Sequence, residues 1–289
     1  MSEKKYSAPM RFAHRGLVQY APENTIAAFE AAIDRGFEGI EIDIGVSSDG
    51  EPIVAHDASF KRMTGGAVKT KLCDMRWEDI VSVELPYEKH LLPVKLPPLT
   101  QLEFLAAFPS IVPGERFGAD GRVLRGKDTR VTHLSRFADF DKWFASRTED
   151  VIIEIEIKAR GIMPRLHEIL AVSPNNSRYI VFSGNSDINA EIQAEFAHTG
   201  KPAGLRLGAN IRFLTDEKKV FVEKSDLFEV GLNAGHITDD SIKWLKARNV
   251  RVLSNLGDYP KWWEQLVKLD VMGFKTNYAE AFTAWLEKN

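Results

Sequence analysis

The sequence is short of several features that mark common classes of protein. It has one cysteine, Cys73, so no disulfide can form within the chain, which suits a reducing cytosol. No run of residues approaches the roughly 18 apolar positions that a membrane span requires, and no apolar segment of a secretory signal follows the charged first residues. We therefore expect a cytoplasmic protein without a transmembrane segment, or a periplasmic or secreted one if a signal peptide has been removed.

Two further absences narrow the choice of partner and of site. The 38 lysines and arginines do not exceed the 41 acidic residues, and the net charge of −3 gives no indication of a nucleic-acid partner. None of the seven histidines lies two residues from another, which counts against a metallohydrolase barrel built on a His-x-His pair. The length of 289 residues suits one domain, residues 1–289, since a single α/β barrel takes about 250.

Short β-rich runs that end in polar residues alternate along the chain with helical patterns. The runs are Arg11–His14, Gly39–Val46, Pro52–His56, Val151–Ile157, Arg178–Phe182, Ala203–Leu207, Leu227–Asn233, Val250–Ser254 and Val271–Thr276. The clearest helical patterns are Thr25–Arg35, Asp239–Arg248 and Tyr259–Leu269. This alternation predicts a (β/α)8 TIM barrel with a mostly parallel sheet. Because a barrel has eight strand positions, we expect one of the nine runs to be an extra hairpin or edge strand.

One region interrupts the alternation of strands and helices. Roughly ninety residues separate Asp57 from the strand at Val151, too many for one connection of a barrel, so we interpret residues 58–149 as an insertion. Within it, Trp77–Val83 and Leu99–Ala107 are helical in pattern. The Gly- and Arg-rich stretch Pro113–Arg136, which includes Arg122 and Arg125, has a local basic excess. We expect that stretch to be either a lid above the site or a solvated surface loop.

Carboxylates alternate with isoleucines on two of the predicted strands. The charged residues are Glu41 and Asp43 on one strand, and Glu154, Glu156 and Lys158 on the other. Side chains alternate along a strand, so each strand has one charged and one aliphatic face. Helices cover the aliphatic face in a barrel, and the charged face must point inward, where unpaired carboxylates need a cation. Glu41, Asp43 and Glu156, with Lys158 beside them, predict an oxygen site for one Mg²⁺ or Ca²⁺.

Two histidines, His14 and His56, close neighbouring predicted strands. Imidazole titrates near neutrality, so the pair could serve as general acid and general base. A lone carboxylate on a strand usually belongs to a solvated face, and a lone strand-end histidine is usually structural. Two acid-bearing strands together with two histidine-bearing strand ends instead favour a catalytic site.

The order and spacing of these motifs resemble the glycerophosphodiester phosphodiesterase family. The motifs are His14-Arg15-Gly16, Pro22-Glu23-Asn24-Thr25, Glu41-x-Asp43, Asp49-Gly50 and His56-Asp57 across residues 11–57, and Glu156-Ile157-Lys158 later. The resemblance implies that Glu41, Asp43 and Glu156 bind the divalent metal, that His14 and His56 are the acid–base pair, that Arg15 and Lys158 contact phosphate, and that Glu23 lines the polar site. Adjacency to Lys158 favours Glu156 over Glu154 as the ligand. We expect Glu154 to lie lower in the barrel, paired with a cation.

The resemblance also implies the reaction, which is cleavage of glycerol phosphodiesters to glycerol 3-phosphate and an alcohol. The metal and the cations would neutralise charge on the phosphoryl oxygens, one histidine would activate the attacking oxygen, and the other would protonate the leaving alkoxide. The attacker could be water or a neighbouring hydroxyl of the substrate. Two alternatives stay open: a lyase or transferase that yields a cyclic phosphate or a new ester, and a barrel that binds a phosphorylated ligand without turnover. The second alternative needs neither histidine.

Three strand ends depart from the family pattern. Ser183-Gly184 stands where the family often has Ser-Phe, Ser254-Asn255 lacks the tryptophan of its strand, and Thr276-Asn277-Tyr278-Ala279 replaces Thr-Asp-x-Pro. The resemblance implies that these positions shape the pocket for the non-phosphate part of the substrate. The partner is then a small-molecule diester whose alcohol the sequence leaves open, along with the oligomeric state.

Overall fold

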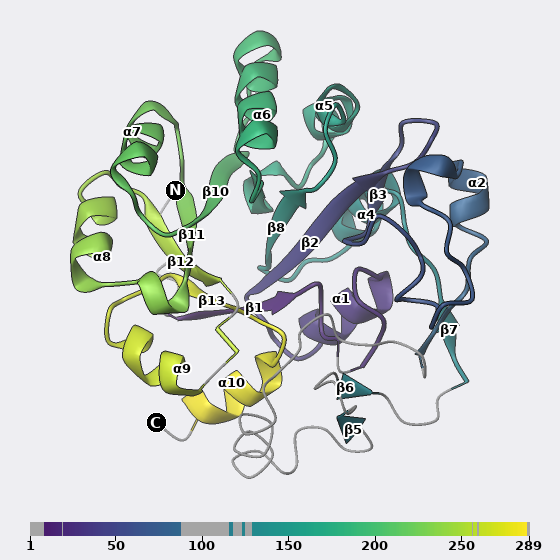
Figure 1. Ribbon diagram of the computed structural model, residues 1–289, viewed down its shortest axis with the longest axis horizontal. Helices are drawn as coiled ribbons and strands as arrows, with labels where there is room; N and C mark the ends of the chain where they lie inside the picture. The colour runs from purple at the N-terminus through teal and green to yellow at the C-terminus, as the bar shows by residue number, and fades with distance from the viewer. Residues whose placement is uncertain are drawn as a thin grey trace.

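Eight parallel strands close into a barrel in the computed structural model, which describes residues 9–18, 20–87, 116–117, 123–124, 129–255, 257–258 and 260–287. The strands of the barrel are β1 (Met10–His14), β2 (Gly39–Val46), β8 (Ile152–Ile157), β9 (Tyr179–Phe182), β10 (Arg206–Arg212), β11 (Glu229–Asn233), β12 (Arg251–Asn255) and β13 (Gly273–Thr276). β1 pairs in parallel with both β13 and β2, and this closes the barrel (Figure 1). The predicted (β/α)8 fold is confirmed.

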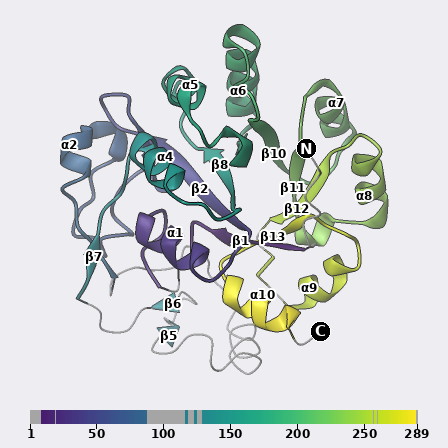
Figure 2. The ribbon, with the colours of Figure 1, turned by 180° about the vertical axis from the view of Figure 1, so that it is seen from behind.

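Helices surround the strands on the outside of the barrel (Figure 2). They are α1 (Ile26–Ile33), α4 (Phe137–Ala145), α5 (Met163–Val172), α6 (Ser186–Thr199), α7 (Asp216–Lys224), α8 (Asp239–Lys246), α9 (Pro260–Val267) and α10 (Ala279–Leu286), with 3₁₀ turns at Leu72–Asp74, Asn176–Arg178 and Ala234–His236. The three clearest helical patterns in the sequence are α1, α8 and α9. Among the helices that the structure describes, none combines the length and apolar character that a bilayer crossing requires.

The aliphatic faces of β2 and β8 pack against these helices, as the alternation in the sequence predicts. The isoleucines of the two faces are Ile40, Ile42, Ile44, Ile153, Ile155 and Ile157, and each is fully buried in the main core. In-register pairing places Asp43 beside Glu156 and Glu41 beside Glu154. The charged faces of both strands therefore point into the barrel.

Of the nine predicted strands, Pro52–His56 is the extra one. It forms a hairpin strand rather than a barrel strand, as the count of runs suggested. β3 (Pro52–Val54) pairs antiparallel with the end of β2. The backbone N–H of Ala55 then donates to the carbonyl of Asp43 at 2.9 Å. This bond holds the residue before His56 against the end of β2 that carries Asp43.

The long segment after β3 supplies both a small subdomain and a barrel helix. α2 (Trp77–Ile80) is present where Trp77–Val83 is helical in pattern, and the two-residue strands β4 (Leu85–Pro86) and β7 (Val131–Thr132) pair with each other. β5 (Arg116–Phe117) pairs with β6 (Val123–Leu124). The predicted helix Leu99–Ala107 and the arginines of the proposed lid, Arg122 and Arg125, lie outside the described residues.

Helix α4 belongs to the outer layer of the barrel. Its Phe137, Phe140 and Phe144 are fully buried in the main core. The ring of Phe140 lies 5.3 Å from that of Phe29 on α1, and the ring of Phe144 lies 5.9 Å from that of Tyr179 on β9. Helix α4 is therefore part of the barrel, and only the segment before Phe137 lies outside the helical layer.

The predicted strand Ala203–Leu207 begins and ends too early, since β10 spans Arg206–Arg212. A turn precedes it, in which Leu205 N–H donates to the carbonyl of Pro202 and Gly204 has a φ of 83°. Glycine and asparagine in Gly208–Arg212 give little local strand preference. Pairing with β11 overrides that preference and extends the strand toward the mouth of the barrel.

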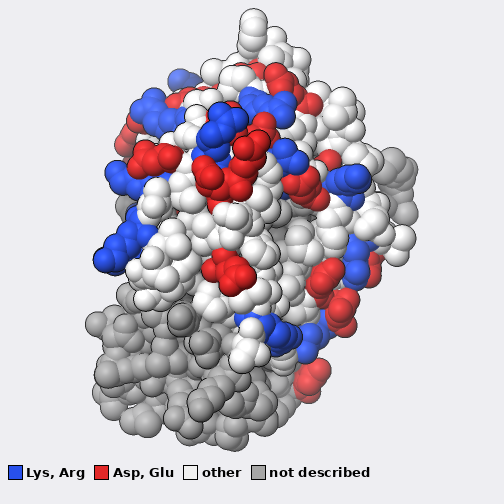
Figure 3. Space-filling model, turned by 90° about the vertical axis from the view of Figure 1, so that its right-hand side faces the viewer, with Lys and Arg blue, Asp and Glu red and all other residues white. Residues whose placement is uncertain are grey.

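Basic and acidic side chains are interleaved on the face shown in Figure 3, and no patch of one sign gathers on its described part. Arg165 forms ion pairs with both Glu168 and Glu51 at 2.7 and 3.1 Å. Exposed pairs of this kind contribute little to stability. The stability of this fold lies instead in the core and in the few charges that the barrel buries.

A buried ion pair forms the polar floor of the barrel. Lys275 on β13 places its Nζ 3.2 Å from Oε2 of Glu154, and Glu229 on β11 lies beside them. All three are at most 3% exposed. Burial raises the pKa of Glu154, Lys275 opposes that effect, and the charge of Glu229 adds to it. Glu154 thus lies one step below Glu156 and is paired with a cation, as expected.

We expect Lys275→Met to lower the free energy of unfolding by about 3–5 kcal/mol, because it leaves two buried carboxyl groups without their cation. The matched control is Lys246→Met, which removes an exposed ion pair with Asp270 and should have a far smaller effect. Urea denaturation of both variants measures the difference. Equal losses would show that the floor does not depend on this charge.

Candidate active site

The polar residues singled out in the sequence meet at the carboxyl ends of β1, β2 and β8. Lys158 Nζ lies 2.8 Å from Glu156 Oε1 and 3.3 Å from Asp43 Oδ1. Across the mouth, His14 Nε2 lies 3.8 Å from Glu41 Oε2. Barrel enzymes keep their active sites at this end of the strands.

Three carboxylates, Glu41, Asp43 and Glu156, offer oxygens that all lie within 4.8 Å of one another. All three residues are buried. Among the described residues, Glu41 Oε1 is buried without a hydrogen-bond partner, and Asp43 Oδ1 is buried with an ion pair to Lys158 but no hydrogen bond. Buried carboxylate oxygens are too costly to leave unsatisfied, and a hard divalent cation with oxygen ligands satisfies them. The donor set therefore fits Mg²⁺ or Ca²⁺.

The electrostatics of the carboxylates point the same way. Burial, and then the charge of Asp43, raise the pKa of Glu41 well above its usual range. Burial would also raise the pKa of Asp43, but Arg15 and Lys158 outweigh it and hold that pKa below its usual range. The protein's own cations thus compensate Asp43 but leave Glu41 short of positive charge, which a bound metal would supply.

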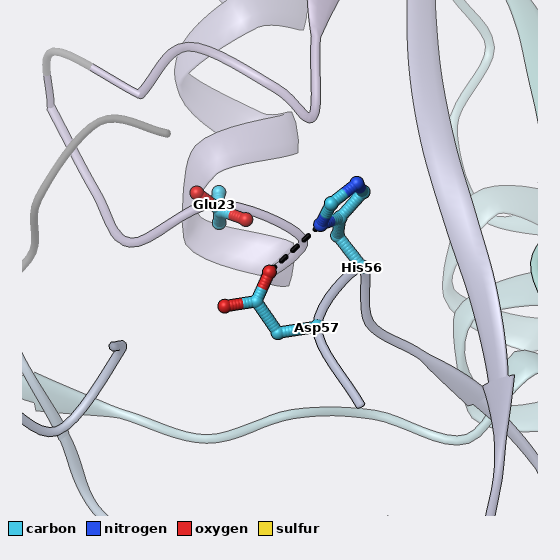
Figure 4. Close-up of side chains that lie close together, drawn as sticks. All are labelled: Glu23, His56 and Asp57. Carbon is cyan, nitrogen blue, oxygen red and sulfur yellow. Dashed lines mark hydrogen bonds and ion pairs between the residues drawn. The ribbon is translucent and has the colours of Figure 1, made fainter. Parts of the chain in front are cut away.

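A second acidic cluster, Glu23, His56 and Asp57, has the spacing of a metal site but is already neutralised (Figure 4). Arg62 donates from Nη1 and Nη2 to the two oxygens of Glu23 at 2.7 and 2.6 Å. Its Nε donates to Asp57 Oδ2 at 2.7 Å. One guanidinium therefore spans both carboxylates, and the cluster is an ion-pair network. No pattern in the sequence indicated Arg62, because it lies in a segment without periodicity.

His56 takes its orientation from this network. Its Nδ1 lies 2.7 Å from Asp57 Oδ1 (dashed in Figure 4), and the second ring nitrogen points away from Glu23 and Asp57. Burial opposes ionisation of Asp57, but hydrogen bonds from His56 and Arg62 hold its pKa below the usual range. The carboxylate on Nδ1 therefore fixes the orientation of the ring and directs the other nitrogen away from the network.

His14 is held by a different kind of partner. Its Nδ1 lies 2.7 Å from Asn277 Oδ1. The Asn277 amide is fixed in turn, since its Nδ2 donates to Asp258 Oδ2 at 2.8 Å and its backbone N–H donates to Asp258 Oδ1 at 2.9 Å. The amide oxygen therefore faces His14, so Nδ1 carries the hydrogen and Nε2 is the acceptor. Burial, and then Arg15, lower the pKa of His14 well below its usual range.

Sequence reasoning missed Asp258 altogether. Asn277 was predicted only to help shape the pocket for the non-phosphate part of the substrate, and its contact with His14 was not foreseen. Asp258 follows β12 by three residues and is buried beside Thr276, which donates to Asp258 Oδ1 at 2.7 Å. A pairing between two strand ends 19 residues apart has no signature in local spacing.

The turn after β1 explains two of the sequence motifs. Arg15 has a φ of 62°, and Gly16 has a φ of 85° with a virtual Cβ only 2.8 Å from Ala28 Cβ, so only glycine fits there. Asn24 has a φ of 55°, and its side chain donates to Asp43 Oδ2 and accepts from Asp43 N–H. Left-handed residues beside a site indicate strain that the surrounding structure supports. The turn at Arg15 and Gly16 orients the Arg15 side chain, and the two hydrogen bonds from Asn24 hold Asp43 in place.

The remaining predicted residues differ in how accessible they are. Lys158 is 28% exposed at its side chain and reaches solvent at the mouth. Glu23 is fully buried, and Arg15 Nη1 also donates to its Oε1 at 2.9 Å. Glu23 therefore acts on the position of Arg15 and Arg62.

Sequence comparison agrees with the geometry. The profile of the glycerophosphoryl diester phosphodiesterase family matches residues 14–196, more than half of the chain. The chain belongs to that family. This match covers the predicted site residues, while Asp258, Lys275 and Asn277 lie beyond it.

Curated relatives are similar over the first part of the chain. Glycerophosphodiester phosphodiesterase 1 of Rattus norvegicus is 40% identical over 85 residues, 29% of this chain and 25% of that protein. Glycerophosphodiester phosphodiesterase of Caldanaerobacter subterraneus is 48% identical over 54 residues, 19% of this chain and 22% of that protein. The matches thus span about a quarter of the length of these relatives.

Solved structures share the fold over nearly the whole chain. A phosphodiesterase from Oleispira antarctica, in complex with the product sn-glycerol-3-phosphate, has a TM-score of 0.71 and 16% identity, covering 96% of this chain and 97% of that one. The glycerophosphodiester phosphodiesterase of Thermotoga maritima has a TM-score of 0.60 and 20% identity, covering 95% and 97%. At these identities the likeness shows the fold.

Proposed function

We propose that the protein is a divalent-metal-dependent phosphodiesterase that cleaves glycerophosphodiesters to glycerol 3-phosphate and an alcohol. The observation that carries this is the buried trio Glu41, Asp43 and Glu156 beside Lys158, in which Glu41 Oε1 has no hydrogen-bond partner among the described residues. Family membership supports the substrate class, and so does the Oleispira antarctica neighbour with sn-glycerol-3-phosphate as its product.

The residues at the mouth divide the work of phosphodiester cleavage. A bound divalent cation supplies positive charge to the phosphoryl oxygens. Lys158, partly exposed beside Asp43 and Glu156, adds a second positive charge at the same place, and Arg15 a third. Charge that develops on the phosphoryl oxygens during cleavage is then met by fixed cations.

Proton transfer falls to the two histidines, and their partners distinguish them. His14 presents Nε2 as an acceptor because neutral Asn277 fixes the hydrogen on Nδ1. We assign it the role of accepting the proton of the attacking oxygen. His56 is held at Nδ1 by the carboxylate of Asp57, and we assign it the donation of a proton to the leaving alkoxide. Phosphorus NMR of the products distinguishes hydrolysis from release of a cyclic phosphate.

Removing the metal tests the proposal directly. We expect exhaustive chelation to abolish release of alcohol from glycerophosphodiesters, and Mg²⁺ or Ca²⁺ to restore it, because the carboxylates then regain their counter-charge. The control is Glu30→Gln, which removes a carboxylate on the outer helix α1 and should leave the response unchanged. Full activity in the chelated protein would mean that the three carboxylates have another role.

The Asp258–Asn277 pair provides a finer test of the role of His14. We expect Asp258→Ala to lower kcat roughly 10–100-fold with little change in KM, because the Asn277 amide can then turn its nitrogen toward His14. Steady-state kinetics on one diester measure both constants. Asp270→Ala, which removes an exposed carboxylate that pairs with Lys246, is the control. A rise in KM at unchanged kcat would place Asp258 in substrate binding instead.

A further inference from the structure

A cavity of about 550 Å³ lies between α6 and α7, beside the carboxyl end of β10. Its size is in the range of small-molecule sites. None of the residues assigned above to catalysis, metal binding or phosphate contact lines it. The proposed chemistry therefore leaves this cavity without a role.

The cavity adjoins the proposed metal ligands through two residues. Gly184 lines it and donates its backbone N–H to Glu156 Oε1 at 3.3 Å. Asn210 lines it as well, and its Oδ1 accepts a hydrogen bond of 2.7 Å from Asn255 Nδ2 at the end of β12, two strands away in the barrel. A side chain at position 184 would stand between Glu156 and Asn210, since a virtual Cβ lies 3.1 Å from Glu156 Oε1 and 3.9 Å from Asn210 Cβ. Glycine leaves the space between these two side chains open.

The wall of the cavity combines apolar surface with positive charge. Ile211, Phe213 and Phe221 supply apolar groups, and Phe213 is 42% exposed. Arg212 and Lys218 bring two positive charges against one carboxylate, Glu217, which leaves an excess of one. Lys218 Nζ lies 4.2 Å from the centre of the Phe213 ring. Such a wall suits a ligand with an apolar body and an anionic end.

The backbone at this wall is irregular in a way that sets Arg212 apart. The register between β10 and β11 shifts between Asn210 and Arg212, and Arg212 has a φ of 64°. Within the described residues, no hydrogen bond or ion pair of its side chain accounts for that conformation. Bulges and left-handed residues concentrate at functional sites because the surrounding structure must support their strain. The bulge places a cation at the cavity instead of continuing the strand.

We infer that this cavity binds the alcohol part of the diester substrate, and that this alcohol has an apolar body and an anionic end. The inference rests on the proposed function, since it assigns the phosphate to Lys158 and the metal ligands. Elsewhere at the site, Arg15 and Arg62 both bind the carboxylate of Glu23. Gly184, which lines the cavity and hydrogen-bonds Glu156, brings the apolar wall next to the metal ligands, within reach of the esterified group.

Three substrates with the same glycerol 3-phosphate part test the inference: the esters of ethanol, of 1-octanol and of 8-hydroxyoctanoate. The two long alcohols leave equally well, so differences between them report on the end group. We expect kcat/KM to rise at least about tenfold from the ethyl to the octyl ester, because each buried methylene is favourable. We expect a further gain for the carboxylate that falls as salt is added.

Variants of the wall separate the cavity from the catalytic site. Ala190 lines the cavity from α6, and Ala190→Trp should reduce the octyl ester to the level of the ethyl ester while leaving the ethyl ester unchanged. Ala197→Trp, on the same helix but outside the lining, is the matched control. Arg212→Asn should abolish only the gain from the carboxylate, because asparagine tolerates the left-handed conformation. Lys224→Asn removes a charge elsewhere, on α7, and serves as its control.

Binding of octanoate without turnover provides an independent readout. Calorimetry should detect binding that Ala190→Trp and Arg212→Asn weaken at least about fivefold and that the two controls leave unchanged. Octanoate binding without cleavage of any diester would support the cavity as a binding site but overturn the proposed function. Cleavage without preference for the octyl ester, or equal loss on all esters in Ala190→Trp, would overturn the assignment of the cavity.

Discussion

His14→Ala and His56→Ala are each expected to lower the turnover of a glycerophosphodiester about 10²–10⁴-fold, the usual cost of losing a general acid or base. Metal affinity should persist in both variants, because neither histidine belongs to the carboxylate trio. Steady-state kinetics and calorimetric titration with Mg²⁺ or Ca²⁺ measure the two effects. The control is His167→Ala, which removes an exposed histidine that contacts the carbonyl of Gly200.

The two variants should differ when the leaving alcohol is very acidic. A nitrophenyl ester departs without a proton, so it makes the general acid unnecessary but not the general base. His56 is bound to Asp57 and is assigned the acid role, so we expect partial rescue of His56→Ala and none of His14→Ala. Rescue of His14→Ala alone would reverse the assignment. Rescue of neither, or loss of metal in both, would make at least one histidine a ligand.

The sequence was sufficient for the barrel and for the carboxylates at its mouth because both follow from alternation. Isoleucine occupies every second position of Ile40–Ile44 and Ile153–Ile157. Once the helices are placed outside the barrel, the isoleucines must face them and the carboxylates must face inward. The same periodicity placed Glu154 and Glu156 on one face. Periodicity could not say which of the two glutamates lies nearer the mouth. The contact of Glu154 with Lys275, on a strand more than a hundred residues later, places Glu154 below Glu156.

Tertiary pairing decided what the sequence could not predict. Arg62 and Asp258 lie in segments without periodicity, and their roles depend on partners from other strand ends, Glu23 and Asn277. The end of β10 was placed too early because its glycine and asparagine favour no strand locally. That error concealed Arg212, which the pairing with β11 places at the strand end beside the cavity.

A comparison of two isosteric substitutions on one strand tests which glutamate holds the metal. We expect Glu156→Gln to lower kcat/KM roughly 10³-fold, because several kcal/mol of charge stabilisation depend on the bound cation. Glu154→Gln should stay close to the unaltered protein in activity, since Glu154 faces Lys275 and Glu229 below the site. Activity and calorimetric metal affinity are measured for both variants at matched metal concentrations.

The metal dependence of the two variants separates a ligand from a structural residue. Glu156→Gln keeps the shape of the side chain and one oxygen, so raising the metal concentration should recover part of its activity. Glu154→Gln should instead show an unchanged metal affinity, with any loss appearing in the free energy of unfolding, because burial already raises the pKa of Glu154 and a neutral side chain fits its place. If Glu154→Gln lost the metal and Glu156→Gln retained it, the ligand would be Glu154. Glu156 would then act through Lys158, 2.8 Å away, on the phosphate.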